Sequence, residues 1–241
     1  MENAKYTHYY RGYKCNHFEK EQVIPVFATG QYLATEKGKD NFSKDLIYFY
    51  KYGYPDLLNN FLNRFLDIYS FRFRTYDDIN FDYVCLAPTH EEGKFNGNME
   101  ILVRGFCEKT GLTYEKGALR RMKTVNEQHL IKEKEKRYEN VNGSIELNLN
   151  AKNKNILVFD NIATTGATAD IIFDLLKRGG ANKVFFYVIG LNGSKNFDLN
   201  PTLKQGANWV VEKFHGLKTS KEERLEYKKV QGISTDKSNP K

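Results

Sequence analysis

The stretch from residue 155 to residue 190 constrains the fold of this chain more than any other part of the sequence. It begins with the apolar run Asn155 to Phe159 (NILVF) and ends with a second run, Val184 to Ile189 (VFFYVI). Apolar residues at three- and four-residue spacing predict a helix between the two runs, with Gly179 and Gly180 at its end. This order predicts a right-handed crossover between two parallel strands, with its first loop at the carboxyl edge of the sheet.

Other segments repeat the alternation of strand and helix. Residues 83–87 predict a short strand that ends before Pro88, and the helix that follows has Gly111 as its stop. Residues 43–52 and 56–69 predict two further helices. We therefore expect an α/β fold, with a Rossmann-like, largely parallel sheet flanked by helices.

The composition along the chain divides it into three parts. Residues 1–42 are aromatic and polar with weak strand patterns, and we assign them to a small amino-terminal hood or cap. Residues 43–217 are assigned to the core, which includes a basic arm at 117–148. Residues 218–241 lack apolar periodicity and are assigned to a basic polar tail.

The chain of 241 residues is basic, with a formal net charge of +7. This charge is compatible with phosphorylated ligands or with nucleic acid and is diagnostic of neither. No apolar run reaches the roughly 18 to 20 residues that span a bilayer, and Met1 to Tyr10 is too polar for a signal peptide. We expect a cytoplasmic protein that does not enter a membrane.

Small and hydroxyl residues fill the segment between the first strand of the crossover and its helix, Asp160 to Thr168 (DNIATTGAT). Such a turn exposes backbone N–H groups at the positive end of the helix dipole, and threonine hydroxyls add donors. Gly166 permits a ligand to approach the backbone, and Thr168 is expected to cap the helix. The segment predicts a cradle for a phosphate monoester, with Asp160 and Asn161 near the hydroxyls of the attached sugar. A tight turn before a well-capped helix is the alternative.

Residues 156–168 (ILVFDNIATTGAT) resemble the phosphoribosyl-pyrophosphate motif of type I phosphoribosyltransferases, in which apolar residues precede an acidic pair and a loop of the TTG type. The resemblance implies a type I phosphoribosyltransferase-like fold in which Asp160 and Asn161 contact the ribose hydroxyls. It also implies a 5-phosphate site made by six residues: Ala163, Thr164, Thr165, Gly166, Ala167 and Thr168.

Three further segments resemble the ComF family of competence proteins within that superfamily, namely residues 43–69, 87–111 and 119–141. The second segment resembles the loop on the pyrophosphate side of the site. We expect ligand contacts there from Thr89, His90 and Lys94; His90 is alternatively a simple loop histidine. The third segment resembles a flexible arm, whose pattern begins at Arg120 or Arg121 and continues with these residues: Thr124, Gln128, Arg137, Asn140 and Val141.

The basic arm has a chemical role if the chain transfers a phosphoribosyl group. Displacing pyrophosphate builds negative charge on the leaving group, so the reaction needs cations over the diphosphate and exclusion of water. Arg120, Arg121, Lys123 and Arg137 are the arm cations that we expect to fold over the site. We expect catalysis to depend on four residues: Asp160, Asn161, Arg121 and Arg137. The alternative is a solvated charged hairpin or helix face.

Magnesium is the expected cofactor, from the charge of the ligand and from the family resemblance. We expect pyrophosphate oxygens, sugar oxygens and water to hold the ion. Among the protein side chains, Asp160 is the one candidate for a direct ligand of the magnesium ion. The three cysteines lack CxxC spacing and predict neither a disulfide framework nor a zinc site.

Two classes of function remain open from the sequence. One is an enzyme that binds phosphoribosyl pyrophosphate and transfers phosphoribosyl to an unidentified acceptor. The other is a catalytically reduced binding or regulatory protein that uses the basic arm and tail for nucleic acid, in DNA uptake, processing or defence. Asn161 lacks the charge of a second acid, and Thr164 cannot act as a base at neutral pH, so hypoxanthine or guanine salvage is not expected. Type I relatives often form dimers, so a homodimer is a further expectation.

Overall fold

The structure is a computed structural model that describes most of the chain as far as Asn192. It describes residues 9–14, 23–33, 41–70, 73, 79–127, 130, 131 and 133–192. The predicted tail at 218–241 and the predicted core boundary at 217 lie outside the described residues.

A six-stranded sheet forms the centre of the fold, in the order β1-β2-β8-β7-β3-β4. Every neighbouring pair is parallel except β1 and β2, so five strands form a parallel sheet with an antiparallel strand at one edge. The strand bounds are Tyr9–Lys14 for β1, Val23–Tyr32 for β2, Lys183–Asn192 for β8, Asn155–Ala163 for β7, Tyr83–Leu86 for β3 and Thr113–Tyr114 for β4. The sheet confirms the predicted α/β class.

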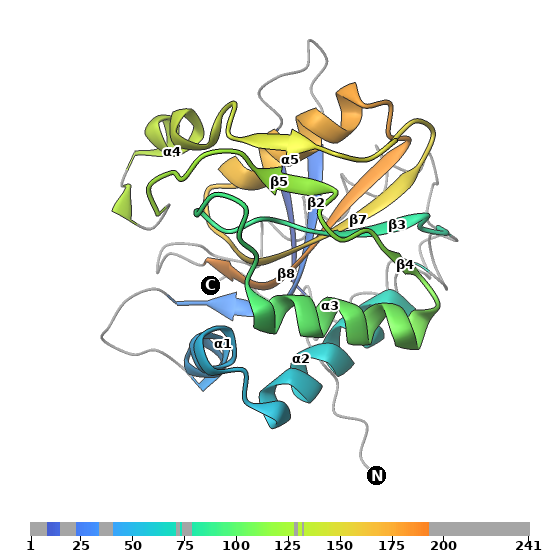
Figure 1. The fold of residues 1–241 in the computed structure, drawn as a ribbon. Helices are drawn as coiled ribbons and strands as arrows, with labels where there is room; N and C mark the ends of the chain where they lie inside the picture. Colours follow the sequence, from blue (N-terminus) through green and yellow to red (C-terminus); the bar gives the residue numbers. More distant parts are fainter. Residues whose placement is uncertain are drawn as a thin grey trace, which may run out of the picture.

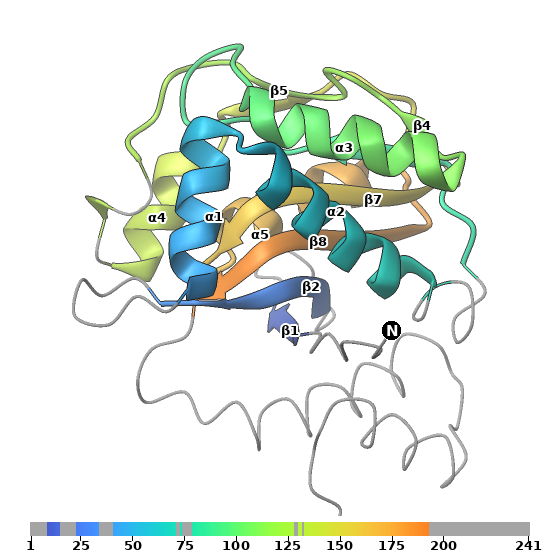
Figure 2. The same cartoon turned by 90° about the horizontal axis from the view of Figure 1, so that it is seen from below.

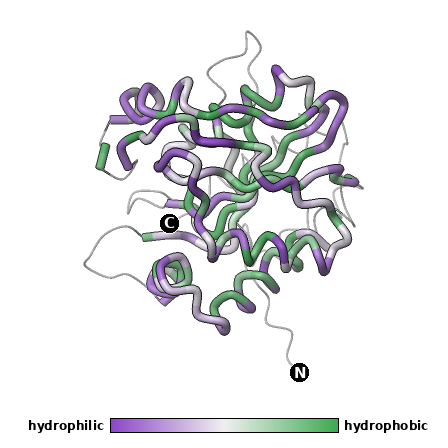
Figure 3. The backbone as a smooth tube through the Cα atoms, in the orientation of Figure 1, coloured by the Kyte–Doolittle hydropathy of each residue, from purple (hydrophilic) through white to green (hydrophobic). Residues whose placement is uncertain are grey.

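Helices cover both faces of the sheet (Figures 1 and 2). One face carries α1 (Asn41–Tyr52), α2 (Pro55–Ile68) and α3 (Gly97–Thr110), and the other carries α5 (Ala167–Arg178). Apolar side chains alternate between two buried clusters, one on each face. On the first face aromatic rings meet across the layers, and the ring of Phe65 stacks on that of Tyr187 at 5.3 Å. The hydrophobic stretches therefore gather in the central strands (Figure 3).

The predicted crossover at 155–190 is confirmed, since β7, α5 and β8 follow one another and the two strands pair in parallel. The first strand is longer than the apolar run suggests. Pairing with β8 continues from Asp160, opposite Val188, to Ala163, opposite Leu191. The backbone pairing therefore carries the strand past the point at which the apolar side chains stop.

The expectation of a separate hood at residues 1–42 is wrong for the part of that segment that the structure describes. Strand β2 pairs in parallel with β8, and β1 pairs with β2, so both belong to the main sheet. Pro25 and Gly30 weaken the strand pattern of this segment. Pairing with β8 begins at Val26, after the proline, so the proline removes no hydrogen bond from that interface.

The predicted basic arm contains a short hairpin and a helix. Strands β5 (Leu119–Arg121) and β6 (Ile145–Leu147) pair in an antiparallel sheet, and α4 (Lys134–Val141) lies between them in the sequence. The side chains of Leu119, Val141 and Ile145 belong to the same buried cluster as α5. The base of the arm is thus packed onto the core. Among the helices that the structure describes, none is long and apolar enough to cross a membrane.

Candidate functional site

Parallel strands end at one edge of the sheet, and the loops after β7 and β3 meet there. The segment after β7 runs from Thr164 to Gly166, and the segment after β3 runs from Ala87 to Asn96. Helix α1 crosses the same edge, beyond the ends of β2 and β8 (Figure 2). In open parallel sheets this edge is where ligands bind. The structure therefore brings together two segments that the sequence associates with a ligand.

The turn at the start of α5 is shorter than predicted. Asp160 to Ala163 belong to β7, α5 begins at Ala167, and only Thr164 to Gly166 form the turn. Gly166 has a φ of 83°, in the left-handed region, and occupies the N-cap position without a side-chain hydrogen bond. Thr168 is therefore not the cap, contrary to expectation. The first N–H groups of the helix have no carbonyl partners within it, so they can serve an anion.

Asp160 and Asn161 lie just before this turn and are both partly buried. A side-chain oxygen of Asp160 accepts from the N–H of Asn161 at 2.7 Å, and Oδ1 of Asn161 accepts from the N–H of Ile162 at 2.7 Å. Burial raises the pKa of Asp160 to about 6, against the Asn161 N–H and the charge of Arg121, which lower it. The carboxyl is thus mostly ionised at neutral pH and titrates just below it.

Arg121 is placed differently from the expectation of a cation that folds over the site. Arg121 is buried, with only 3% of its surface exposed. Nε donates to the carbonyl of Thr89 at 2.9 Å, and Nη1 donates to the hydroxyl of Ser144. Burial lowers the pKa of Arg121, and the charge of Asp160 opposes that shift. Arg121 is therefore a fixed link between the base of the arm and the loop after β3, whereas Arg120 beside it is exposed.

Arg137 links the arm to the turn before α5. Its Nη1 donates to Oγ1 of Thr164 at 3.1 Å, and its Nε donates to the carbonyl of Ile131 at 2.6 Å. Helix α4 thus presents a guanidinium to the same three-residue turn that opens α5. A cation in this position would stabilise a phosphate bound at the start of the helix.

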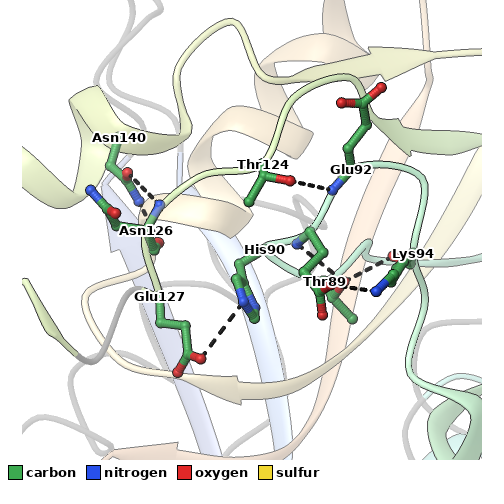
Figure 4. A network of polar contacts seen from close by, with 9 residues as sticks. Thr89, His90, Glu92, Lys94, Thr124, Asn126, Glu127 and Asn140 are labelled. Atoms are coloured by element: carbon green, nitrogen blue, oxygen red, sulfur yellow. Dashed lines mark hydrogen bonds and ion pairs between the residues drawn. The ribbon is translucent and has the colours of Figure 1, made fainter.

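The arm also lies against the loop after β3, through residues 89–94 and 121–127 (Figure 4). The contacts are Gly93 N–H to the Arg121 carbonyl at 2.9 Å, Val125 N–H to the His90 carbonyl at 2.9 Å, Glu92 N–H to Thr124 Oγ1 at 3.1 Å, and His90 Nε2 to Glu127 Oε1 at 3.6 Å. His90, Thr124 and Arg121 are therefore part of one interface. Gln128 of the predicted arm pattern lies outside the described residues.

Thr89 and Lys94 close the loop after β3 on itself. The hydroxyl of Thr89 donates to the carbonyl of Lys94 at 3.0 Å, and the N–H of Thr89 donates to the same carbonyl at 3.0 Å. The ammonium of Lys94 is exposed and forms an ion pair with Glu91 at 2.5 Å. Both residues lie in the loop that the sequence associates with pyrophosphate, and their contact with a ligand stays a prediction.

Tyr50 is a residue of this edge that sequence reasoning missed. It is partly buried on α1. Burial raises its pKa first, and the charge of Asp160 raises it further, whereas hydrogen bonds with the side chains of Asn96 and Asn161 lower it. The sequence predicts two helices within residues 43–69, one of the segments that resemble the ComF family, and it indicates no site residue there. The proximity of Tyr50 to Asp160 arises from tertiary structure.

Within the described ranges, no group of three or more His, Cys, Asp or Glu side chains is arranged to hold a metal ion. Asp160 is the carboxylate that the site itself supplies at the end of β7. A single carboxylate fits a magnesium ion whose remaining ligands are phosphate oxygens and water. It does not fit an ion enclosed by protein ligands.

Comparison with known proteins gives similarity in structure alone. No protein-family model matches the chain, and no curated protein matches it. An adenine phosphoribosyltransferase is 14% identical over 77% of this chain and 85% of its own length, with a TM-score of 0.42. The adenine phosphoribosyltransferase of Saccharomyces cerevisiae is 14% identical over 76% of this chain and 84% of its own length, with a TM-score of 0.41.

A third solved structure, an allosteric regulatory enzyme of purine biosynthesis, is 18% identical to this chain, with a TM-score of 0.35. The match covers 54% of this chain and spans only 24% of that enzyme's length. Similarities at these values say nothing about what this chain binds.

Proposed function

We propose that this chain binds phosphoribosyl pyrophosphate with magnesium and transfers the phosphoribosyl group to an acceptor, with release of pyrophosphate. One observation carries the proposal. Asp160 and Asn161 lie in the last four residues of β7, the strand that leads into the turn Thr164 to Gly166, and Arg137 donates to that turn at 3.1 Å. Hydrogen-bonding groups for a sugar and donors for a phosphate thus follow one another along the edge.

The parts of the ligand can be assigned to parts of the edge. The 5-phosphate binds at the segment from Ala163 to Thr168, where backbone N–H groups and threonine hydroxyls are donors. The ribose hydroxyls bind Asp160 and Asn161. The diphosphate extends toward residues 89–94, where Lys94 carries a positive charge. Type I phosphoribosyltransferases, which the sequence motif resembles, arrange their ligand in this order.

In the proposed reaction the bond between C1 of the ribose and the diphosphate oxygen breaks, and both of its electrons leave with pyrophosphate. A nitrogen or oxygen of the acceptor forms a new bond to C1 and loses its proton to water or to the departing pyrophosphate. Asp160 is the residue of this chain that would help to hold a magnesium ion, together with ligand oxygens and water, and the bound ion would supply positive charge to the departing diphosphate. Arg137 stabilises the 5-phosphate end, and Arg121 holds the loop that faces the diphosphate. Thr164 cannot act as a base at neutral pH, so the proposed acceptor is neither hypoxanthine nor guanine.

A second candidate is binding without turnover. Asn161, in place of an acid, adds no negative charge beside the reacting sugar, and Arg121 is committed to Thr89 and Ser144. A protein of this kind would sense phosphoribosyl pyrophosphate and use exposed arm cations such as Arg120 and Lys123 for nucleic acid. Binding to an oligonucleotide that falls steeply with salt, without pyrophosphate release, favours this candidate.

Pyrophosphate release tests the enzyme directly. The chain is incubated with phosphoribosyl pyrophosphate, magnesium and a panel of bases and amines, and released pyrophosphate is measured by a coupled assay. Release should disappear in Thr165→Ala. It should persist in Thr113→Ala, the same change at an exposed residue of the outer strand β4. Absence of release for every acceptor, with binding intact, supports the second candidate. Equal release from both variants contradicts the proposed site.

A further inference from the structure

The part of the arm that follows β5 lies against the loop after β3 without forming a strand or a helix. This part is residues 122–127 (Figure 4). Backbone groups in such a segment need partners from other elements. The N–H of Val125 donates to the carbonyl of His90 at 2.9 Å, and the hydroxyl of Thr124 accepts from the N–H of Glu92 at 3.1 Å. Residues 122–127 are therefore bonded to the loop that we assign to the diphosphate.

Asn140 bonds the same segment to helix α4. Its Oδ1 accepts from the N–H of Asn126 at 3.1 Å, and its Nδ2 donates to the carbonyl of Asn126 at 2.8 Å (Figure 4). One amide side chain thus matches both the donor and the acceptor of one backbone residue. A flipped amide would place oxygen against the carbonyl and lose both bonds. The two contacts give the backbone of Asn126 one position relative to α4.

Helix α4 carries Asn140 close to two other contacts. Three residues before it, Nη1 of Arg137 donates to Oγ1 of Thr164 at 3.1 Å. Residues three apart are neighbours on the surface of a helix. The next residue, Val141, is fully buried in the cluster that includes α5. Helix α4 is therefore packed on the core and bonded at one place to the turn and at another to residues 122–127.

These hydrogen bonds connect the two ends of the proposed site. They lead from the turn before α5, which we assign to the 5-phosphate, to the loop after β3, which we assign to the diphosphate. The bonds are Thr164 to Arg137, Asn140 to Asn126 and Val125 to His90, with α4 and the backbone between them. A contiguous network of this kind can transmit a change at one site to another.

We infer that Asn140 is a positioning residue that couples the phosphate end of the site to the diphosphate end. The inference rests on the proposed function. A phosphate bound at the turn holds Arg137 and with it α4, and Asn140 then holds residues 122–127 against the loop after β3. A ligand that spans both ends finds them already ordered, so it loses less conformational entropy on binding. Asn140 itself contacts no ligand in this proposal.

The test compares Asn140→Ala with a matched control. Asn140→Ala removes both bonds to Asn126, and it does not weaken α4, because alanine favours a helix more than asparagine does. Asn142→Ala makes the same change two residues further on, at an exposed residue that contacts Tyr138 through its backbone N–H alone among the contacts described. Urea unfolding checks that both variants are folded.

The affinities for a long and a short ligand are measured by titration calorimetry with magnesium. Asn140→Ala should bind phosphoribosyl pyrophosphate roughly fivefold more weakly than the unaltered chain. This is the lower end of the usual range for coupled sites, because both bonds of Asn140 are exposed to water. Ribose 5-phosphate, which reaches only the phosphate end, should change by less than about twofold. Unchanged affinity for phosphoribosyl pyrophosphate, or an equal loss for both ligands, would contradict the inference.

Hydrogen exchange at Val125 measures the coupling itself. Its N–H is bonded to His90 and not to Asn140, so the substitution leaves this bond in place. Ribose 5-phosphate should slow the exchange of this N–H roughly fivefold in the unaltered chain and in Asn142→Ala, and should leave it unchanged in Asn140→Ala. A role of Asn140 in stability alone would not produce this difference. Slowing that persists in Asn140→Ala would contradict the inference.

Failure of the inference is separable from failure of the proposed function. If the unaltered chain binds neither ligand, the proposed function fails, and the inference fails with it. If the chain binds both ligands and Asn140→Ala behaves like it in both measurements, only the inference fails. Exchange at Val125 in the unaltered chain covers the case of a misfolded variant. If ribose 5-phosphate binds and does not slow that exchange, the two ends are not coupled and the inference is wrong.

Discussion

The guanidinium of Arg137 donates to the hydroxyl of Thr164 at 3.1 Å, and this contact joins the basic arm to the turn at the start of α5. The two residues are 27 positions apart in the sequence and belong to different elements, since Arg137 lies on α4 and Thr164 in the turn before α5. Their contact places the arm beside the turn that we propose as the phosphate site. It also means that the arm approaches the site through α4 as well as through residues 121–127.

The first prediction follows from this contact. Arg137→Ala should weaken binding of ribose 5-phosphate and of phosphoribosyl pyrophosphate by about 1.5 to 3 kcal/mol, because a charge-assisted hydrogen bond to phosphate is lost. Arg178→Ala is the matched control, since Arg178 is exposed at the other end of α5 and pairs only with Asp174 among the contacts described. Titration calorimetry measures both. Equal affinities for the two variants would remove Arg137 from the site.

Gly166 allows backbone strain to be separated from ligand binding. Gly166→Ala should cost about 1 to 2 kcal/mol of folding free energy, because its φ of 83° is unfavourable for a residue with a Cβ. Gly117, with a φ of 77° and nothing within 4 Å of an added Cβ, provides Gly117→Ala as a control of similar cost. Denaturant unfolding should show comparable losses, and only Gly166→Ala should lose affinity for ribose 5-phosphate. Loss of affinity in both would point to a general effect of destabilisation.

Asp160 predicts a specific pH dependence of stability. Its pKa is raised from the usual 3.8 to about 6 in the folded chain, so between these pH values the folded state binds a proton more strongly than the unfolded state does. Asp160 therefore stabilises the folded state at low pH. This stabilisation, up to roughly 3 kcal/mol, is lost as the pH rises from about 4 to 6. Asp160→Asn should abolish this component, as measured by urea unfolding at pH 5 and pH 7. An unchanged pH profile in the variant would assign the component to other groups.

Arg121 and Arg120 are neighbours with opposite predicted effects on stability. Arg121→Ala should lower the free energy of unfolding by roughly 3 kcal/mol, because it leaves the Thr89 carbonyl and the Ser144 hydroxyl without their buried donor. Arg120→Ala should change it by less than about 0.5 kcal/mol, as is usual for an exposed side chain. Thermal or denaturant unfolding of the two variants measures both changes in the free energy of unfolding. Similar small effects in both variants would mean that Arg121 is not the fixed link that its contacts describe.

Much of the fold follows from local sequence, and the exceptions have physical causes. The run NILVF and the helix after it predict β7, α5 and β8 because their side chains are buried on both faces of a parallel sheet. Strand β2 is missed because Pro25 and Gly30 disturb its pattern, although neither prevents the pairing that starts at Val26. The extension of β7 to Ala163 is missed because the polar side chains of Asp160 and Asn161 mask a backbone that continues to pair.

The site is less predictable than the fold, because its residues come from distant segments. The turn after β7 is recognisable from its composition. The burial of Arg121 depends on Thr89 and Ser144, which no spacing rule connects with it. The charge of Asp160 affects the pKa of Tyr50 only because α1 packs near the end of β7, and no local sequence pattern predicts that proximity.

The central claim is that phosphoribosyl pyrophosphate binds at the end of β7. Titration calorimetry with this ligand and magnesium, comparing the unaltered chain with Asp160→Ala, tests it most directly. We predict saturable heat with the unaltered chain at one site, and an affinity at least roughly tenfold lower in the variant, which loses a charged hydrogen-bond acceptor for the ribose. No heat with either protein, or equal affinity for both, would contradict the account.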